Sequence, residues 1–313
     1  MTDAPRVLVI KLGALGDFIQ ALGPMAAIKR HHAGARLTLL TTPPFAAFAR
    51  ATGYFDEVWL DERPPLWRLG RVLALRRRLN AGRFDRVYDL QTSDRSSFYF
   101  RLFAPRPEWS GIARGCSHPH ANPGRDAMHT VERQRDQLAM AGIRDVPVTD
   151  LSWLDVDVSR FALKPPYVLL VPGGSAHRTA KRWPTERYGE LAKTLAARGY
   201  TVATIAAEDE KGVTEAIAKA APHVRDLAGL TSFADIVALA RRAAAAIGND
   251  TGPMHLIAGA GCPAVVLFSS ASDPALCAPR APEGAAPVAV LRRGALADLS
   301  VTDVLAALRP RAH

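Results

Sequence analysis

Cysteine, aromatic residues and long apolar runs are all scarce in this chain of 313 residues. Its three cysteines, Cys116, Cys262 and Cys277, are too few and too widely spaced for a disulfide framework or a paired zinc motif, so we expect reduced thiols. No apolar run approaches the ~18 residues that a membrane-spanning helix requires. The opening MTDAPR leads directly into the strand-like VLVI, without the order of a signal peptide, so we expect a cytoplasmic protein.

Acidic residues are outnumbered by basic ones, 30 against 40, which gives a formal net charge of +10 at pH 7. Such a balance favours an anionic partner: nucleic acid, a phosphorylated substrate or a membrane surface. A nucleic-acid surface interleaves basic with aromatic residues, whereas here the aromatics are 7% and the arginines are scattered. We therefore expect that nucleic acid is not a partner. A basic nucleic-acid-binding protein is kept as an alternative hypothesis.

Both halves of the chain alternate short apolar runs with stretches of helical periodicity, as in a parallel sheet covered by helices. The first half has RVLVI, RLTLL, EVWL, RVYDL and EWSGI; the second has YVLLVPG, YTVATIAA, VRDLAG, AAAIGND, PAVVLFS and VAVLRR. This pattern predicts an α/β chain of two Rossmann-like doubly wound domains, 1–157 and 158–313, facing each other across a cleft. The linker is DVSRFALKPPY, residues 157–167. Such sheets bind ligands at the carboxyl ends of their strands.

The first loop of interest is VIKLGALGDFIQAL, in which Gly13 and Gly16 permit a tight turn after the first strand. Its spacing is not G-x-G-x-x-G, and no acidic residue closes the next strand, so we reject a nicotinamide site. Asp17 lies at the head of the following helix. It is either an ordinary first-turn carboxylate stabilised by the helix dipole or a group with a chemical role.

Two loops of the second half also carry polar groups. VPGGSAHRTAKRW offers glycines, the hydroxyl of Ser175 and the ammonium of Lys181, which make either a solvated basic loop or a cradle for an anionic leaving group. AAEDEKG follows another strand, and Glu208 and Glu210 could bind ribose hydroxyls or be first-turn helix acids.

The stretch AIGNDTGPMH ends one strand and begins a helix at Pro253. A helix N-terminus there would let Thr251, Gly252 and the following backbone N–H groups point at a phosphate. Asp250 could be a helix cap. His255, in the first turn, is either a structural residue or part of the same site.

The segment PPLWRLGRVLALRRRL, residues 64–79, is basic and amphipathic. It is either a surface helix packed on the first domain or an element that binds a phosphorylated lipid or the surface of a membrane.

Soft metal ligands gather in GCSHPHANPGRDAMH, with Cys116, His118, His120 and His129. The run is broken by prolines and has no C-x-x-C pair, so we expect a mobile loop of the cleft and no metal site.

The motifs KLGALGDFIQALGP, AKRWPTERYGELA and GNDTGPMHLIAGAGCPAVVLF occur in this order, with weaker matches at YDLQTSDRSS and MHTVERQRDQLAMAGI. On these motifs the chain resembles glycosyltransferase family 9, the bacterial lipopolysaccharide heptosyltransferases. The resemblance implies a GT-B architecture, with the acceptor on the first domain and a nucleotide sugar on the second. It also implies an inverting, metal-independent transfer of a sugar, heptose from ADP-heptose, to a lipopolysaccharide-core or related saccharide acceptor. The ADP-sugar is a substrate, and no cofactor is expected.

The resemblance further implies roles for single residues. Asp17 matches the catalytic base and Lys181 the lysine that stabilises the diphosphate. The donor-side candidates are Ser175, Glu208, Glu210, Asp250, Thr251, Gly252 and His255. Among them, Glu210 matches the ribose-binding acid of the family, with Glu208 as the alternative, and Asp250 is expected to be free to accept hydrogen bonds from the hydroxyls of the transferred sugar. The acceptor-side candidates are Gly13, Gly16, Arg76 and Arg95. An anionic glycolipid acceptor would bring the protein to the cytoplasmic face of the inner membrane. A non-catalytic sugar-nucleotide-binding protein is a further alternative, against which the presence of both Asp17 and Lys181 argues.

Overall fold

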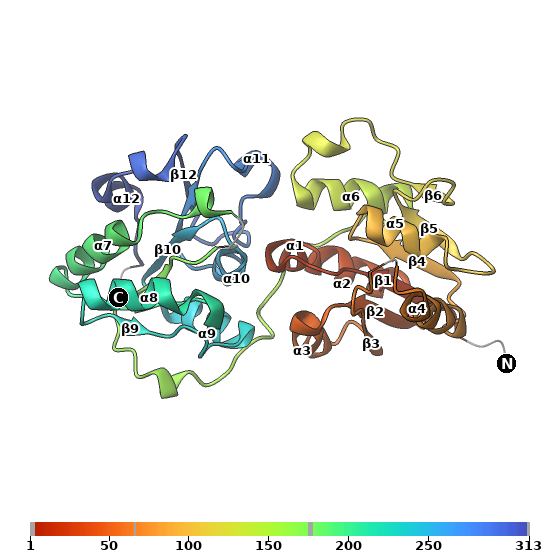
Figure 1. Ribbon diagram of the computed structural model, residues 1–313, viewed down its shortest axis with the longest axis horizontal. Helices are drawn as coiled ribbons and strands as arrows, with labels where there is room; N and C mark the ends of the chain where they lie inside the picture. Colours follow the sequence, from red (N-terminus) through yellow and green to blue (C-terminus); the bar gives the residue numbers. More distant parts are fainter. Residues whose placement is uncertain (1–3, 66, 175–177, 312–313) are drawn as a thin grey trace. The chain divides into compact units, whose positions relative to one another are not determined.

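The computed structural model describes residues 4–65, 67–174 and 178–311. The chain divides into two compact units, Met1–Thr149 and Asp150–His313. Each unit contains one six-stranded sheet in which all strand pairs are parallel (Figure 1). The predicted fold class, α/β with two Rossmann-like sheets, is confirmed.

The sheet of the first unit has the strand order β3-β2-β1-β4-β5-β6. Its strands are β1 (Arg6–Ile10), β2 (Arg36–Thr41), β3 (Glu57–Leu60), β4 (Arg86–Asp89), β5 (Glu108–Gly111) and β6 (His118–Pro119). Its helices are α1 (Leu15–Gln20), α2 (Leu22–His31), α3 (Pro43–Ala51), α4 (Leu69–Ala81), α5 (Asp94–Phe100), η1 (Arg125–Ala127) and α6 (Thr130–Met140). The order reverses between β1 and β4, so the carboxyl ends of these two strands form the crevice where such sheets bind ligands.

The second sheet has the order β12-β11-β10-β7-β8-β9. Its strands are β7 (Tyr167–Val171), β8 (Thr201–Thr204), β9 (Arg225–Asp226), β10 (Ala245–Asn249), β11 (Ala264–Phe268) and β12 (Val288–Arg292). Its helices are η2 (Ser159–Phe161), η3 (Thr179–Lys181), α7 (Thr185–Ala197), η4 (Glu208–Glu210), α8 (Lys211–Ala220), α9 (Phe233–Arg242), α10 (Gly252–Gly259), α11 (Pro274–Cys277), η5 (Leu296–Asp298) and α12 (Val301–Ala307). The switch point of this sheet lies between β7 and β10.

The apolar runs become strands because a parallel sheet covered by helices buries both of its faces. In β1, Val7 to Ile10 are at most 1% exposed, and the whole of β7 is buried. In the second unit, Trp183 just before α7 packs edge-on against Tyr188, with ring centroids 4.9 Å apart, and its indole N–H donates to the carbonyl of Leu299. The rings fix the start of α7, and with it the end of the loop that follows β7.

Among the residues that the structure describes, no helix is long and apolar enough to cross a membrane.

Candidate active site

In the first unit, the loop after β1 is held in place from several sides. Gly13 has φ +128°, and a Cβ there would lie 3.0 Å from the ring of Phe45, so the position requires glycine. The backbone N–H of Leu12 donates to Gln91 Oε1 at 2.8 Å, and its carbonyl accepts from Thr42 Oγ1 at 3.0 Å. These contacts fix the direction in which α1 leaves the sheet, and so the place of Asp17 in its first turn.

Asp17 lines a small polar cavity at the switch point of the first sheet. The cavity has a volume of about 50 Å³ and is lined by Lys11, Asp17, Leu90, Gln91, Thr92, Arg133, Gln134 and Gln137. A space of this size holds on the order of one to a few water molecules, or a single hydroxyl group. The half-buried carboxylate of Asp17 therefore lies where one hydroxyl could be received among polar groups.

Two buried charges support this cavity, and sequence reasoning missed both. Lys11 is 3% exposed and donates from Nζ to the carbonyl of Leu90 at 3.0 Å. Asp89, at the end of β4, is fully buried and accepts from the backbone N–H groups of Gln91 and Thr92 at 3.1 and 3.0 Å. The signal was the presence of each charged residue directly at a strand end, in VIKLG and YDLQ.

Burial and charge shift the proton affinities of this pair in opposite directions. Burial raises the pKa of Asp89 to about 6, against the lowering effect of hydrogen bonds from Thr92 and other neighbours and of the charge of Lys11. Burial also lowers the pKa of the Lys11 ammonium, whereas the carboxylates of Asp17 and Asp89 raise it. Desolvation thus opposes the charged form of Lys11, and the two carboxylates near it favour that form.

Helix α6 contributes the remaining polar wall. Gln137 Nε2 donates to the carbonyls of Asp89 at 3.0 Å and of Ser110 at 3.3 Å, which ties α6 to the ends of β4 and β5. Arg133, one turn earlier on α6, lines the cavity of Asp17. The sequence indicated a weak motif here, but not that this arginine meets Asp17.

The other acceptor-side candidates do not line this cavity. Gly16 is in the first turn of α1, next to Asp17. Arg95, on α5, donates to the carbonyl of Pro64 at 3.3 Å. Arg76 is exposed on α4. The structure thus brings Asp17 together with Lys11 and Arg133, whereas neither Arg76 nor Arg95 lines the cavity.

In the second unit, the predicted donor loops meet at the switch point between β7 and β10. Lys181 Nζ lies 2.5 Å from Asp250 Oδ2, and the two side chains are 12% and 7% exposed. Ser272 Oγ donates to the same carboxylate oxygen at 2.8 Å. The expectation that Asp250 is simply available to sugar hydroxyls therefore needs correction, because its Oδ2 is already engaged by Lys181 and Ser272.

Asn249 connects the two loops, a role that the sequence did not reveal. It is fully buried, and its Nδ2 donates to the carbonyls of Pro172 at 2.7 Å and Gly173 at 3.1 Å. Its Oδ1 accepts from the Trp183 backbone N–H and from the Tyr188 hydroxyl, both at 3.0 Å. One amide side chain thereby holds the end of β10, the loop after β7 and the start of α7 in fixed positions.

The helix predicted to hold phosphate is α10. Thr251 precedes its first residue in an extended conformation, and Thr251, Gly252 and Pro253 are half-buried. His255 is 7% exposed inside the first two turns. The residues expected to bind phosphate thus lie at the N-terminus of α10, and His255 is buried in the same helix.

The two acidic candidates of the loop after β8 have different surroundings. Glu210 accepts from the backbone N–H of Gly174 at 2.5 Å and of Ala207 at 3.0 Å, one contact for each carboxylate oxygen. A Cβ at Gly173 would lie 2.3 Å from Glu210 Oε2, so Gly173 leaves room for this contact. The side chain of Glu208 is 73% exposed. Glu210 therefore fastens two loops together, whereas Glu208 faces solvent. Ser175 lies outside the described residues.

The histidine-rich segment 115–129, expected to be a mobile loop, is held against α6 by its side chains. His120 is buried and lies 2.8 Å from Asp136 Oδ2, and the ring of His129 accepts from the backbone N–H of Val131 at the start of α6. Within the described part of the chain, no group of three or more histidine, cysteine or acidic side chains is placed to hold a metal ion.

The sequence of the chain matches a known family. The model of glycosyltransferase family 9 (heptosyltransferase) matches residues 72–305. The chain belongs to this family. It is 30% identical over 228 residues to lipopolysaccharide heptosyltransferase 2 of Salmonella typhimurium, a match that covers 65% of each chain. It is 28% identical over 289 residues to lipopolysaccharide heptosyltransferase 1 of Pseudomonas aeruginosa, which covers 84% of this chain and 78% of the relative.

The solved structure of E. coli ADP-heptose lipopolysaccharide heptosyltransferase II has the same fold. Its TM-score is 0.77 at 22% identity, over 96% of this chain and 97% of that chain. The match to the Salmonella relative spans just under two thirds of that protein's length. The family and the two-sheet fold are therefore shown.

Proposed function

We propose that this protein is an inverting, metal-independent glycosyltransferase that moves heptose from ADP-heptose to a lipopolysaccharide-core or related anionic saccharide acceptor. Family membership supports transfer of a heptose, and the name of the related E. coli protein supports ADP-heptose as donor. Within the molecule, the observation that carries the proposal is the 2.5 Å pair of Lys181 and Asp250 at the switch point of the second sheet. It puts a buried ammonium beside the N-terminus of α10.

In the proposed reaction, an acceptor hydroxyl attacks the anomeric carbon while the bond from this carbon to the diphosphate oxygen breaks on the opposite face. The hydroxyl proton passes to the carboxylate of Asp17, which lines a cavity large enough for one such group. Lys11 and Arg133 supply positive charge around that carboxylate and suit an anionic acceptor. Single displacement with a base on one face inverts the configuration of the sugar.

Negative charge grows on the departing ADP, and the second unit can stabilise it. Lys181, Thr251 and the N-terminus of α10 are the groups that we assign to the diphosphate. Asp250, which accepts a hydrogen bond from Ser272, holds the ammonium in place before the donor arrives. The sugar hydroxyls are the expected partners of the other carboxylate oxygen of Asp250, Oδ1. We assign His255 and Gly252 to the same donor site.

For the ribose, the geometry favours Glu208 over Glu210. Both oxygens of Glu210 already accept backbone N–H groups, so a ribose would have to displace one of these contacts. The side chain of Glu208 is 73% exposed and its carboxylate lies 3.9 Å from Lys211 Nζ, so it can accept hydroxyls without losing a backbone hydrogen bond. Glu210 then acts by positioning the glycine loop. We also propose a cytoplasmic location, since that is where nucleotide sugars are made available to such an acceptor.

The test is a donor panel with two readouts. ADP-heptose, a UDP-sugar and a GDP-sugar are each added to the protein, and thermal stabilisation and nucleotide release in the presence of a lipopolysaccharide-core acceptor are measured. A donor at 100 times its dissociation constant adds ~2.7 kcal/mol of stability. We expect both stabilisation and acceptor-dependent ADP release with ADP-heptose. Stabilisation without release would instead indicate a non-catalytic sugar-nucleotide-binding protein.

A further inference from the structure

Helix α4 is attached to the first unit by a narrow stripe. Of its 13 residues, Leu79 alone is buried, and Val72 and Leu75 are half-buried against the core of the unit. No aspartate or glutamate occurs anywhere from Arg63 to Phe84. The helix therefore presents most of its surface, with a single sign of charge, to the surroundings.

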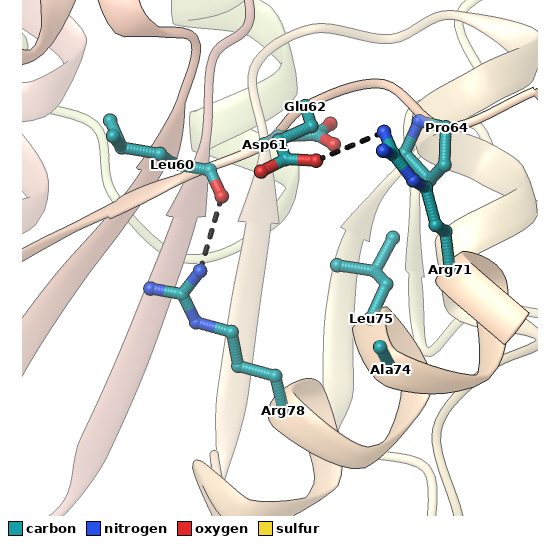
Figure 2. A pocket seen from close by; sticks show the side chains of 8 residues that line it. All are labelled: Leu60, Asp61, Glu62, Pro64, Arg71, Ala74, Leu75 and Arg78. Atoms are coloured by element: carbon teal, nitrogen blue, oxygen red, sulfur yellow. Dashed lines mark hydrogen bonds and ion pairs between the residues drawn. The ribbon is translucent and has the colours of Figure 1, made fainter.

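One flank of α4 faces the end of β3 and the segment that follows this strand, as Figure 2 shows. A pocket of about 210 Å³ lies between this flank and the end of β3, lined by Leu60, Asp61, Glu62, Pro64, Arg71, Ala74, Leu75 and Arg78. Arg71 pairs with Glu62 at 3.4 Å. Arg78 donates to the carbonyl of Leu60 at 3.2 Å, and its guanidinium lies 4.7 Å from the ring centre of Trp59. These two arginines serve the packing of the helix.

The outward flank is different. Leu69, Leu73, Arg76 and Arg77 follow one another at the spacing i, i+4, i+7 and i+8, which places them on one face of the helix. Leu69 is 69% exposed and Leu73 49%, and Trp67, two residues before the helix, is 81% exposed. Among the described residues, no carboxylate pairs with Arg68, Arg76 or Arg77.

We propose that this outward face, formed by Leu69, Leu73, Arg76 and Arg77, together with the exposed Trp67 and Arg68 that precede the helix, is a docking surface for an anionic phospholipid bilayer. An indole favours the boundary between headgroups and acyl chains, and leucines on the same face gain by leaving water. The arginines meet the headgroup phosphates while their alkyl stems cover apolar surface. The combination of exposed apolar side chains with uncompensated positive charge fits a bilayer, which offers both environments within a few ångströms.

Other occupants fit less well. A second copy of this chain would bring two sets of arginines together, and such like-charge contact opposes association. A nucleic acid would use the arginines but would leave Leu69 and Leu73 in water, since single strands bind by stacking on aromatic rings. This docking does not depend on the proposed glycosyl transfer, because a bilayer without any saccharide is expected to bind.

The test is flotation of the full chain with vesicles of equal parts phosphatidylglycerol and phosphatidylcholine, compared with phosphatidylcholine alone. Each arginine near an anionic surface contributes roughly fivefold to binding, so the triple change Arg68→Ser, Arg76→Ser and Arg77→Ser should weaken binding on the order of a hundredfold. The matched control removes three exposed arginines of the second unit, Arg198→Ser, Arg225→Ser and Arg293→Ser. It makes the same change in net charge and should bind vesicles nearly as well as the unchanged protein.

A second variant separates docking from simple charge attraction. Trp67→Ser leaves the charge unchanged, and it should weaken binding to the phosphatidylglycerol vesicles about tenfold or more. Because all four substituted residues of α4 and its approach are exposed, thermal unfolding of both variants should match that of the unchanged protein. The proposal is overturned if the control weakens binding as much as the α4 triple, or if Trp67→Ser has no effect. It is also overturned if the triple change abolishes binding to random-sequence DNA but leaves vesicle binding intact.

Discussion

Replacing Lys181 by methionine removes the ammonium that lies 2.5 Å from Asp250 Oδ2 while keeping most of the side-chain volume. Asp250 is 7% exposed and would retain Ser272 as a hydrogen-bond donor. Breaking a buried ion pair from one side costs 3–5 kcal/mol when nothing compensates, and the remaining hydroxyl and partial access to water reduce this to about 2 kcal/mol. We therefore expect the free energy of unfolding of the ligand-free protein to fall by that amount.

The same substitution should impair transfer for a separate reason. A charge-assisted contact to a diphosphate is worth about 1.5–3 kcal/mol, which corresponds to at least a tenfold loss in kcat/KM for ADP-heptose. Urea unfolding measures the first effect and steady-state ADP release the second. Lys193→Met, which removes the same charge from an exposed position on α7, is the matched control and should change neither value appreciably.

The double variant Lys181→Met with Asp250→Asn separates the effect on stability from the effect on transfer. Because no lone carboxylate is left in the buried site, most of the lost stability should return, whereas activity should stay low. Unchanged stability and kcat/KM in Lys181→Met would refute the account of the second unit, because Lys181 would then be an ordinary surface lysine. Recovery of activity in the double variant would equally refute the assignment of Lys181 to the leaving group.

Two further predictions concern the interiors of the two units. Burial raises the pKa of the Asp89 carboxyl from 3.8 to about 6, so the folded protein binds a proton at this carboxyl more tightly than the unfolded chain does. Protonation of Asp89 therefore adds to the free energy of unfolding at low pH, and this stabilisation is lost as pH rises from about 4 to about 6. Asp89→Asn should abolish this pH-dependent loss of stability. The same dependence of the free energy of unfolding on pH in the variant and the unchanged protein would contradict the prediction. Gly173→Ala puts a Cβ 2.3 Å from Glu210 Oε2 and should weaken ADP binding by roughly tenfold, measured by calorimetry. Gly174→Ala, whose Cβ would lie 3.6 Å from Arg182 Cγ, the nearest atom among the described residues, is its control, and equal effects of the two changes would argue against a role of the Glu210 contact.

Much of the fold follows from the sequence because parallel strands covered on both faces must be apolar throughout. RVLVI, YVLLV and AVVLF each became a strand that is largely or wholly buried. The stretch VRDLAG was less informative and yielded only the two-residue strand β9. The loops at the carboxyl ends could likewise be located, because Gly, Asp and Thr directly after an apolar run are unusual there.

What the sequence could not show is how polar residues far apart in the chain meet. Lys11 and Asp89 are separated along the chain, and only the pairing of β1 with β4 brings Ile10 opposite Asp89. In the same way, the Lys181–Asp250 contact depends on the pairing of β7 with β10. Local patterns do not encode such register. Lys11 and Asp89 therefore had no signal stronger than a charged residue at the end of an apolar strand, and Arg133 and Asn249 had none beyond the motifs in which they lie.

Comparison of the unchanged protein with Asp17→Asn tests whether Asp17 is the base of the glycosyl transfer. The substitution preserves size and most of the ability to accept hydrogen bonds, but the amide cannot take up the proton of the acceptor hydroxyl. Acceptor-dependent ADP release from ADP-heptose should therefore fall by ~10² to 10⁴, with unfolding and ADP affinity nearly unchanged. Transfer by Asp17→Asn at close to the original rate would contradict the account, since Asp17 would then be only a first-turn carboxylate of α1.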